Sequence, residues 1–594
     1  MSARAKEPAD LNDRALRDRA VSAARGDAPF DLLISGGKIL DVVTNEIRFA
    51  DIGIVGPLIA SVHVPGSRND AGNKLEVAGK FITPGLIDTH MHVESSMVTP
   101  ATYAQKILSR GVTSIVWDPH EFANVYGLAG VEWAINAVAS LPLRFIVLAP
   151  SCVPSAQNME LSGADFGEKE LQQLLAHPEI AGVAEVMNMR GVIEREQRLT
   201  DIVQAGLLSA KPVHGHARSL SGADLNAYMA AGISSDHELT SADDLMEKLR
   251  AGINIELRGS HDHLLPEFVK ALNQLGHLPQ TVTLCTDDVF PDDLDRAGGL
   301  DDVVRRLVKY GLSPNRAVQA ATLNAANRLG RSDLGLLAAG RRADIAIFED
   351  LEDFNATHVI TNGEVVAKAE KLILPVNGYP TNELKNSMKC PALSANDFRV
   401  ASEGERVCIA TIDQPRFTRW GQTQADVKNG FVVPPDDVTL ISVTHRHGLA
   451  QPVPRVGYLR EWGKWRGAFC TSVSHDSHNL TVFGGNEEDM ACAANWVIEH
   501  GGGMAVAANG KILASLALPL LGLMSEAPLS EISADFSAIR AAMEKIVDWQ
   551  PPLLVFKACF GATLACNSGP HQTDMGIADV KRGAPLANPV LEIL

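Results

Sequence analysis

The middle of the chain alternates short apolar runs with longer stretches of helical periodicity. Apolar runs bounded by turn residues predict strands, and the longer segments between them predict helices. Strands that alternate with helices form parallel sheets, and eight of them can close into a ring. Residues 85–334 are therefore predicted to form a (β/α)8 barrel in a protein of the α/β class. The eight predicted strands are KFITPGLIDTH, VTSIVWD, RFIVLAP, IAGVAEV, KPVHGHA, ISSDHE, INIELRG and TVTLCTDD.

Polar side chains gather where each predicted strand ends. The carboxyl ends of barrel strands carry the active site in essentially every characterised enzyme of this fold. The pattern therefore predicts one polar site at the mouth of the barrel. In chain order, these residues are His90 and His92, then Asp118, His120 and Glu121, then Ser151, Glu185, His214 and His216, then Asp236, His237 and Glu238, and finally Arg258, Asp287 and Asp288.

Two β-rich segments flank the barrel. Residues 30–84 and 335–375 contain short β-type runs, which in the first segment are broken by Gly-Gly, Asn and Gly-Pro turns. We predict one small β-sandwich-like domain assembled from both flanks. Residues 1–29 are charged and predict a short helical segment; they lack the apolar stretch of a secretory signal.

The last 219 residues of the 594-residue chain, 376–594, form a further unit. Strand-like runs alternate there with amphipathic helical segments, which predicts a C-terminal α/β or α+β domain. The strand-like runs are VCIATI, VTLISVT, LTVFGG and GGMAVAANG, and the helical segments are EEDMACAANWVIEH and DFSAIRAAMEKIVDWQ. The stretch that begins at Lys511, KILASLALPLLGLM, is predicted to be a buried core segment.

The composition excludes some classes of function. The formal net charge of −18 argues against a nucleic-acid or anionic-membrane surface, since both require a basic patch. No run of about 18 apolar residues occurs, so no membrane span is expected. The eight cysteines are scattered without a Cys-x-x-Cys pair, which is typical of a cytoplasmic enzyme. Cys152 and Cys285 fall in apolar runs and are predicted to be buried thiols.

His90-Met91-His92 ends the first predicted strand. Residues two apart on a strand point to the same face, so both imidazoles can reach one metal ion. A His-x-His pair alone is weak evidence, because two ordinary histidines explain it equally well. Its setting favours ligands, since further histidines and an aspartate close later strands and these groups suit Zn, Mn or Fe.

The order of these groups resembles the amidohydrolase superfamily over residues 30–370. The stretches THMHVESSM, WDPHEFANV, GVAEVMNMRGV, HGHARSLSGADLNAYMAAGISSDHE and SHDSHN resemble the adenine deaminase family over nearly the whole chain. This resemblance implies hydrolytic deamination of adenine to hypoxanthine and ammonia by a metal-activated hydroxide at a binuclear centre. The implied substrate is a small purine.

The resemblance also implies a ligand set for two divalent ions, with Mn or Fe expected and Zn possible. Many amidohydrolases place a carbamylated lysine after strand four, but this chain has Glu185 and no lysine nearby. A glutamate bridge points away from hydrolases of cyclic amides. The implied ligands are His90, His92 and Asp287 for the first ion, His216 and His237 for the second, and Glu185 between them.

Two placements within this set stay open. His214 and His216 face the same way on strand five; the Gly-His-Ala pattern favours His216, which leaves His214 beside the substrate or behind a ligand. Asp287 is expected to move the proton from water to the leaving group. The acid that protonates the purine ring is not settled among Glu121, His120, Asp118, Glu94 and Glu238. Residues expected to contact the substrate are Glu94, His214, Glu238, Asp288, Asp476 and His478.

The C-terminal domain carries two histidine-rich loops, 444–447 and 474–479. By themselves, they indicate solvated loops or a second metal site. The resemblance suggests that this domain helps cover the active site, and the barrel loops look too short to do so. The alternative is an oligomerisation domain, and a homodimer is expected.

Two other functions compete with adenine deamination. An amidohydrolase could deaminate a related aminopurine or another aminated heterocycle. A non-catalytic barrel could serve as a scaffold, but such proteins lose metal ligands, and here every expected ligand type is present.

Overall fold

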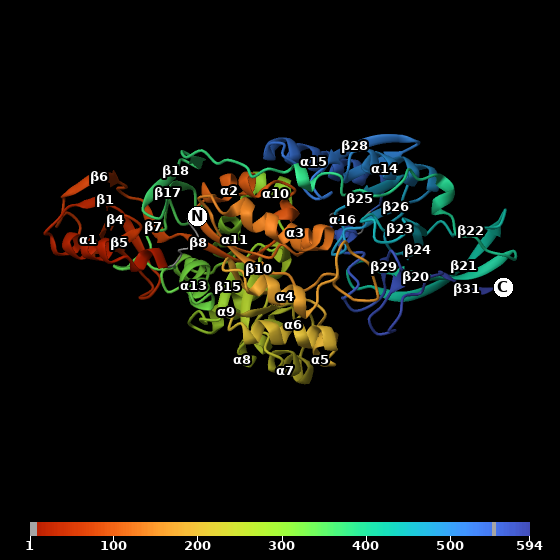
Figure 1. Cartoon of the computed structure of the whole chain (residues 1–594), viewed down its shortest axis with the longest axis horizontal. Coiled ribbons are helices and arrows are strands. Elements are labelled where there is room, and N and C mark those ends of the chain that lie inside the picture. Colours follow the sequence, from red (N-terminus) through yellow and green to blue (C-terminus); the bar gives the residue numbers. More distant parts are fainter. Residues whose placement is uncertain (1–8, 549–553) are drawn as a thin grey trace.

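The computed structural model describes residues 9–548 and 554–594. The molecule is elongated, with three parts in a row along its longest axis (Figure 1). Small sheets formed by the first strands lie at one end, the barrel lies in the middle, and the C-terminal sheet lies at the other end. Functional groups from the barrel and the C-terminal part can therefore meet only at their shared border.

All eight predicted barrel strands are present, and their pairing is parallel. One sheet has the order β12-β11-β10-β9-β8, and a second has the order β13-β14-β15. The Ser234 N–H donates to Val213 O at 3.0 Å and the Asp287 N–H donates to His90 O at 3.0 Å, so backbone bonds link the sheets at both junctions. The predicted (β/α)8 fold is confirmed. The strands are β8 (Leu86–Met91), β9 (Val112–Trp117), β10 (Arg144–Ala149), β11 (Ile180–Val186), β12 (Val213–Gly215), β13 (Ser235–Asp236), β14 (Asn254–Arg258) and β15 (Val282–Cys285).

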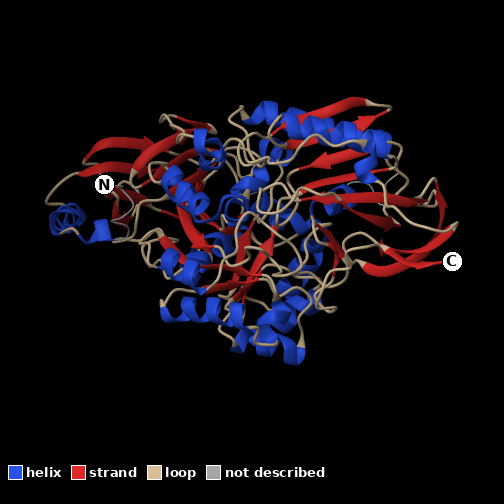
Figure 2. Cartoon of the chain, turned by 45° about the vertical axis from the view of Figure 1, so that its right-hand side comes forward, coloured by secondary structure: helices blue, strands red, loops and turns tan. Residues whose placement is uncertain are grey.

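Helices surround the barrel strands (Figure 2). They turn an apolar face to the strands, because that face buries hydrocarbon while the other side stays in water. Thr99 begins the first of them by accepting the Thr102 N–H at its N-cap. The principal helices are α2 (Pro100–Leu108), α3 (His120–Val138), α4 (Glu168–Leu175), α5 (Met189–Ile193), α6 (Gln197–Leu208), α7 (Gly222–Ala230), α8 (Ala242–Ala251), α9 (Leu265–Gln274), α10 (Pro291–Ala297), α11 (Leu300–Lys309), α12 (Pro314–Gln319) and α13 (Ala325–Arg328).

The first predicted strand is in fact two strands. β7 (Phe81–Pro84) pairs with β16 (Ile345–Phe348) outside the barrel, and only β8 belongs to the barrel. Gly85 separates them, and its N–H donates to Asp344 O at 2.9 Å. A Cβ at this position would lie 2.2 Å from Thr113 Oγ1, so the crossing point has room only for glycine. A continuous apolar run cannot reveal such a change of sheet.

The flanks of the barrel share their sheets. A four-stranded sheet has the order β5-β4-β1-β6, and a seven-stranded sheet, β19-β18-β17-β16-β7-β2-β3, combines strands from both flanks. Ile34 and Ile54 of the first sheet pack in one cluster with Ile82 and Ile345 of the second. The strands are β1 (Phe30–Ser35), β2 (Lys38–Asp41), β3 (Glu46–Phe49), β4 (Asp51–Val55), β5 (Leu58–His63), β6 (Ala71–Glu76), β17 (Ala356–Thr361), β18 (Glu364–Lys368) and β19 (Lys371–Leu372); helix α1 (Arg14–Arg25) precedes them.

A ten-stranded sheet dominates the C-terminal part. Its order is β22-β21-β20-β24-β23-β26-β25-β27-β28, and β31 pairs with β20. The segment from Lys511 is a buried core segment only in its second half: β28 begins there with Leu513 exposed, whereas Leu518, Leu520, Leu523 and Met524 are buried. The strands are β20 (Arg406–Asp413), β21 (Arg419–Lys428), β22 (Phe431–Val433), β23 (Val438–Thr444), β24 (Arg455–Arg460), β25 (Ala468–Thr471), β26 (Leu480–Gly484), β27 (Gly503–Ala508), β28 (Lys511–Ala517) and β31 (Val590–Ile593).

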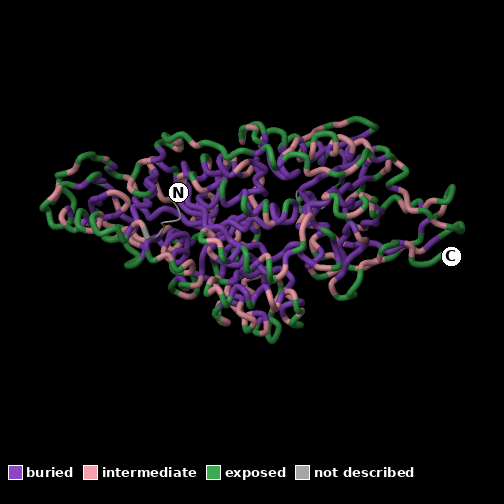
Figure 3. The backbone as a smooth tube through the Cα atoms, in the orientation of Figure 1, coloured by how far each residue is buried: buried purple, intermediate pink, exposed green. Residues whose placement is uncertain are grey.

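The C-terminal part packs closely on the barrel. One apolar cluster contains Val112 and Leu284 of the barrel together with Phe469 and Phe536 of the C-terminal part. Buried backbone accordingly runs through the middle of the molecule, and exposed backbone lies along its rim (Figure 3). Helix α15 (Leu529–Ile546) packs against α10 of the barrel. The other C-terminal elements are α14 (Glu487–Glu499), α16 (Leu554–Phe560) and the hairpin of β29 (His571–Thr573) with β30 (Gly576–Ala578).

Two further sequence predictions can be compared with the described residues. Cys152 and Cys285 are buried free thiols, as predicted. Across residues 9–548 and 554–594, no helix is both long enough and apolar enough to cross a bilayer.

Candidate functional site

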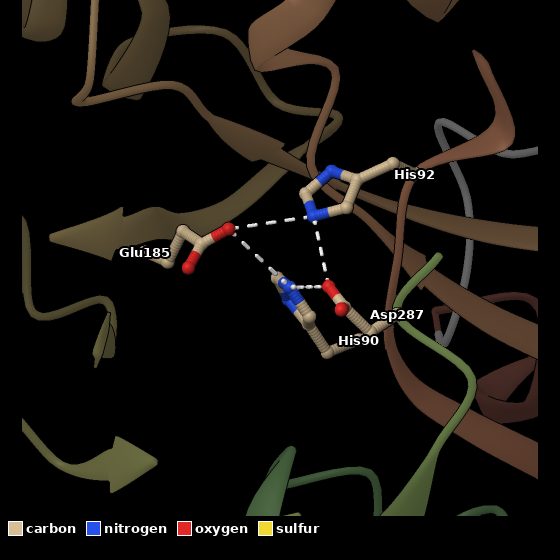
Figure 4. A group of neighbouring side chains, drawn as sticks. All are labelled: His90, His92, Glu185 and Asp287. Atoms are coloured by element: carbon tan, nitrogen blue, oxygen red, sulfur yellow. Dashed lines mark ion pairs between the residues drawn. The ribbon is translucent and has the colours of Figure 1, made fainter. Parts of the chain in front are cut away.

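Four side chains converge at the carboxyl end of the barrel (Figure 4). His90 and His92 come from the end of β8, Glu185 from β11, and Asp287 from the residues just after β15. His92 Nε2 lies 3.3 Å from Glu185 Oε1 and 3.2 Å from Asp287 Oδ1. His90 Nε2 lies 3.6 Å and 3.3 Å from the same two oxygens.

These spacings fit a metal ion. Nitrogen and oxygen ligands lie 2.0–2.2 Å from zinc, so the edges of a tetrahedral ligand set are about 3.3–3.6 Å long. The four measured distances fall close to this range. His90 Nε2 is buried and makes no hydrogen bond to any described residue, whereas Asp287 Oδ2 contacts Arg258. Together with the fold, this donor set supports binding of a divalent cation.

Glu185 also contacts a second pair of histidines. Its Oε2 lies 2.8 Å from His216 Nδ1 and 3.2 Å from His237 Nε2. Burial raises the pKa of Glu185, but His237, His216 and His90 outweigh that effect and hold the pKa well below its ordinary value. The carboxylate is therefore charged and offers one oxygen to each pair, as the bridging role requires.

Of the two strand-five histidines, only His216 lies in this cluster. His214 Nδ1 lies 2.6 Å from an Arg328 nitrogen instead. Burial and the Arg328 charge lower the pKa of His214 to about 3, so it is a neutral side chain. His214 does not line the cavity described below.

Asp287 is held in an uncommon backbone conformation. Its φ of 59° is left-handed, a region that aspartate enters more readily than most residues. Backbone bonds on both sides hold it there, since the Asp287 N–H donates to His90 O and the His92 N–H donates to Asp287 O at 3.2 Å. Burial raises the pKa of Asp287, but the opposing effects of Arg258, His90 and His92 are larger and hold it well below its ordinary value. The carboxylate is therefore ionised.

A cavity of about 730 Å³ opens over these groups. The C-terminal part supplies some of its walls, including His475 and Asp476 of the loop 474–479. Predicted site residues that line it are His92, His120, Glu185, His216, His237, Glu238, Asp287, Asp288 and Asp476. Predicted site residues that do not line it are His90, Glu94, Asp118, Glu121, His214 and His478.

Several of the residues outside the cavity contact residues inside it. Asp118 Oδ2 lies 2.8 Å from His120 Nδ1, and His120 Nε2 lies 3.7 Å from Asp476 Oδ1. Burial lowers the pKa of His120, but the charges of Asp118 and Asp476 raise it well above its ordinary value. Asp118 therefore orients His120, which faces the cavity, and favours its protonated form.

Glu121 lies behind the loop 474–479. Its carboxylate is fully buried and makes no hydrogen bond to a described residue, while His475 Nδ1 lies 3.6 Å away and His478 Nε2 lies 3.8 Å away. Burial raises the pKa of Glu121. Glu94, which accepts the Trp117 indole N–H at 2.8 Å, has a pKa of about 8 because of burial and the nearby Glu121 charge. Glu94 can therefore hold a proton near neutral pH.

Several residues that line the cavity had no role predicted from the sequence. Arg258 pairs with Glu238 and Asp287, and Arg218 Nη1 donates to Glu238 Oε2 at 2.7 Å. His475 is a further addition; burial lowers its pKa, but Asp476, Asp288 and Glu121 raise it to about 9. Arg258 ends a predicted strand, and that position was the available signal. His475 lies in the histidine-rich loop 474–479, of which only Asp476 and His478 were predicted to contact the substrate.

The amino-acid sequence matches families and proteins that are already known. Residues 81–366 match the profile of the amidohydrolase family, and residues 415–584 match the adenine deaminase C-terminal domain. The chain is 66% identical to "Adenine deaminase 2" of Agrobacterium fabrum over 591 residues, which covers 100% of this chain and 99% of that protein. It is 50% identical to "Adenine deaminase" of Klebsiella pneumoniae, over 95% of this chain and 94% of that protein.

The chain belongs to the adenine deaminase family. Its C-terminal match contains the loop 474–479, so the loop that reaches the barrel mouth lies within the region named for this family. A member of the adenine deaminase family is an amidohydrolase that acts on a C–N bond. The resemblance inferred from the sequence is thereby confirmed.

Proposed function

We propose that this chain hydrolyses adenine to hypoxanthine and ammonia. The observation that carries the proposal is the double cluster around Glu185, which faces a cavity lined by both parts of the chain. The near full-length relatives named as adenine deaminases support the choice of substrate. Water supplies the oxygen of hypoxanthine, and the exocyclic amine leaves as ammonia.

The residues fit two divalent ions, and we propose Mn or Fe with Zn as a further possibility. His90, His92 and Asp287 would hold one ion, and His216 and His237 the other, with Glu185 between them. When bound, such ions lower the pKa of water towards neutrality and stabilise developing negative charge. The metal identity and the count of two are part of the proposal.

Asp287 is the proposed base. Its carboxylate is ionised, so it can accept a proton from the attacking water and later return it to the departing amine. Arg258 contacts the same carboxylate and keeps it oriented.

Glu121 and His475 are the proposed proton source for the purine ring. Burial raises the pKa of Glu121, and His475, whose Nδ1 lies 3.6 Å from the Glu121 carboxylate, lines the cavity. A proton can therefore pass from the buried carboxyl to the cavity wall. Glu238 pairs with two arginines and Glu94 lies outside the cavity, so both are less suited to this role.

The related aminopurine remains the competing substrate. The decisive experiment reconstitutes the protein with Mn, Fe or Zn and follows adenine absorbance and ammonia release across a panel of purines and pyrimidines. Adenine should have the highest kcat/KM. A higher value for another aminated heterocycle would replace adenine in this proposal. The homodimer and the cytoplasmic location stay predictions.

A further inference from the structure

Three arginines, Arg218, Arg258 and Arg416, line the same cavity. Arg218 follows β12, Arg258 ends β14, and Arg416 comes from the C-terminal loop between β20 and β21. Thr418 of that same loop also lines the cavity. Burial lowers the pKa of Arg416, and the charges of Arg218 and Arg258 lower it further. The three guanidinium groups are therefore close enough to influence one another.

Two of these arginines have carboxylate partners. Arg218 and Arg258 share Glu238, and Arg258 also contacts Asp287 and lies 3.3 Å from Asp288. Their charges are therefore compensated within the protein.

Arg416 differs from both of them. Within residues 9–548 and 554–594, its guanidinium has no ion pair or hydrogen bond, although it is partly buried and faces two like charges. A partly desolvated cation beside other cations is unfavourable unless an anion joins it. Among the described residues, Arg416 is thus a cation at the cavity that lacks an anionic partner.

His261 provides a second, independent observation. It lines the same cavity, is 9% exposed, and its Nδ1 has no hydrogen-bond partner among the described residues. Burial lowers the pKa of His261, and Arg258, Arg218 and Arg416 lower it further, so the ring is neutral. A neutral imidazole can donate one hydrogen bond to an anion without adding charge.

The loop that carries Arg416 is also locally strained. Gln414 and Arg416 have φ values of 65° and 70°, in the left-handed region that disfavours such side chains. Phe417, between Arg416 and Thr418, lies under the Arg218 guanidinium at 5.2 Å from its ring centroid. This contact ties the loop to the barrel arginine and keeps Arg416 at the cavity wall.

We propose that Arg416, Arg218 and His261 form an oxyanion subsite that binds a phosphate-type group beside the purine site. Guanidinium groups bind such groups through paired N–H donors. The cavity volume of about 730 Å³ lies in the range that holds drug-sized ligands, so it exceeds what a purine base requires. The phosphate could be free or attached to a purine, and the test separates these sources.

The test is calorimetric titration of the metal-loaded full-length protein with inorganic phosphate at fixed ionic strength. Arg416→Gln should weaken phosphate binding at least about tenfold, because a charged hydrogen-bond donor is lost. Arg416→Lys should recover part of the affinity, since it restores the charge. Arg419→Gln is the matched control, because Arg419 is exposed on β21 and pairs with Glu461. Metal content and melting temperature should be equal in all four proteins.

Titration with adenosine monophosphate and adenosine distinguishes the two sources. Tighter binding of the monophosphate than of phosphate or adenosine, lost in Arg416→Gln, would assign the subsite to a purine phosphate. Equal binding of phosphate and the monophosphate would assign it to the free anion. Absence of saturable phosphate binding, or equal affinity in wild type and Arg416→Gln, would overturn the proposal. These heats of binding do not depend on adenine turnover, so failure of the proposed function would be seen separately.

Discussion

Glu185 has two carboxylate oxygens that lie in different clusters, Oε1 near the β8 histidines and Oε2 near His216 and His237. A single side chain therefore fixes the separation of the two candidate metal positions. Loss of a bridging ligand should weaken metal binding at both positions, whereas loss of any one histidine should weaken it mainly at one.

Replacing Glu185 by glutamine should reduce the metal content below half of the wild-type value. The amide has no negative charge, and its nitrogen cannot serve as a ligand, so both positions are weakened. Elemental analysis after dialysis measures the content. Glu194→Gln is the control, since Glu194 is exposed and pairs with Arg190. Full metal content and full activity in Glu185→Gln would remove this residue from the bridge.

Replacing Asp287 by asparagine should lower kcat by about 10²–10⁴-fold, the usual contribution of a general acid–base group. Steady-state kinetics on adenine measures the change, and circular dichroism checks that the fold persists. Metal content must be determined in parallel, because Asp287 is also a proposed ligand. A kcat within a few-fold of wild type would show that another group moves the proton.

Glu160 is a buried carboxyl that is not one of the proposed ligands. Burial raises its pKa to about 8, although Ser155 Oγ donates to it at 2.5 Å. The folded state therefore holds a proton that the unfolded state releases near pH 4.5. Stability from this group is full below about pH 4.5 and is lost as pH rises to about 8, with a slope of at most about 1.4 kcal/mol per pH unit.

Glu160→Gln should reduce this loss of stability between pH 5 and 8, because an amide does not ionise. Urea unfolding at several pH values gives the free energies. Glu94 contributes a similar dependence, so only part of the slope should disappear. Identical pH slopes in both proteins would contradict the prediction.

At the scale of elements, the loop 474–479 connects the C-terminal sheet to the barrel site. It follows β25 and precedes β26, and its residues are mostly buried rather than solvated. Asp476 faces His120, while His478 lies behind it, with Nδ1 accepting the Ser474 N–H at 3.2 Å. This placement favours the covering role over a distant assembly surface.

Asp476→Ala should lower kcat/KM for adenine by about tenfold or more, because the buried His120 loses a charge partner. His478→Ala should also lower it, by loosening the loop 474–479 in front of Glu121. Metal content and association state should stay unchanged in both variants, as checked by elemental analysis and light scattering. Normal kinetics in both, or a change of association first, would favour the assembly role instead.

At the scale of the whole molecule, the site depends on the border between barrel and C-terminal part. Arg540 of α15 lies 3.1 Å from Asp292 and 3.4 Å from Asp293 of α10, and its guanidinium stacks over Phe290 and Phe536. These contacts lie beside the cavity, which Arg540 and Asp293 also line.

Arg540→Ala should therefore destabilise the protein by about 1–3 kcal/mol and lower kcat/KM. Thermal unfolding and adenine kinetics measure the two effects. Arg466→Ala is the control, because Arg466 forms a comparable but exposed pair with Asp548. If both variants behave alike, the α10–α15 contact has no special part in holding the site together.

The amino-acid sequence alone determined the order of elements and the chemistry of the site. Eight apolar runs ending in polar residues were enough for the barrel, because strand periodicity and the end at which barrel sites lie are local properties. His90, His92, Glu185, His237 and Asp287 lie at or just beyond the ends of barrel strands, and the family resemblance implied them as ligands.

Only the tertiary structure decided which groups meet across the chain. The change of sheet at Gly85, the choice of His216 over His214, and the arrival of His475 and Arg416 at the barrel mouth depend on contacts between segments far apart in sequence. The pKa values of Glu121 and His475 likewise follow from burial and neighbouring charges. Periodicity reports the environment along one segment, whereas desolvation and charge pairing arise when separate segments pack together.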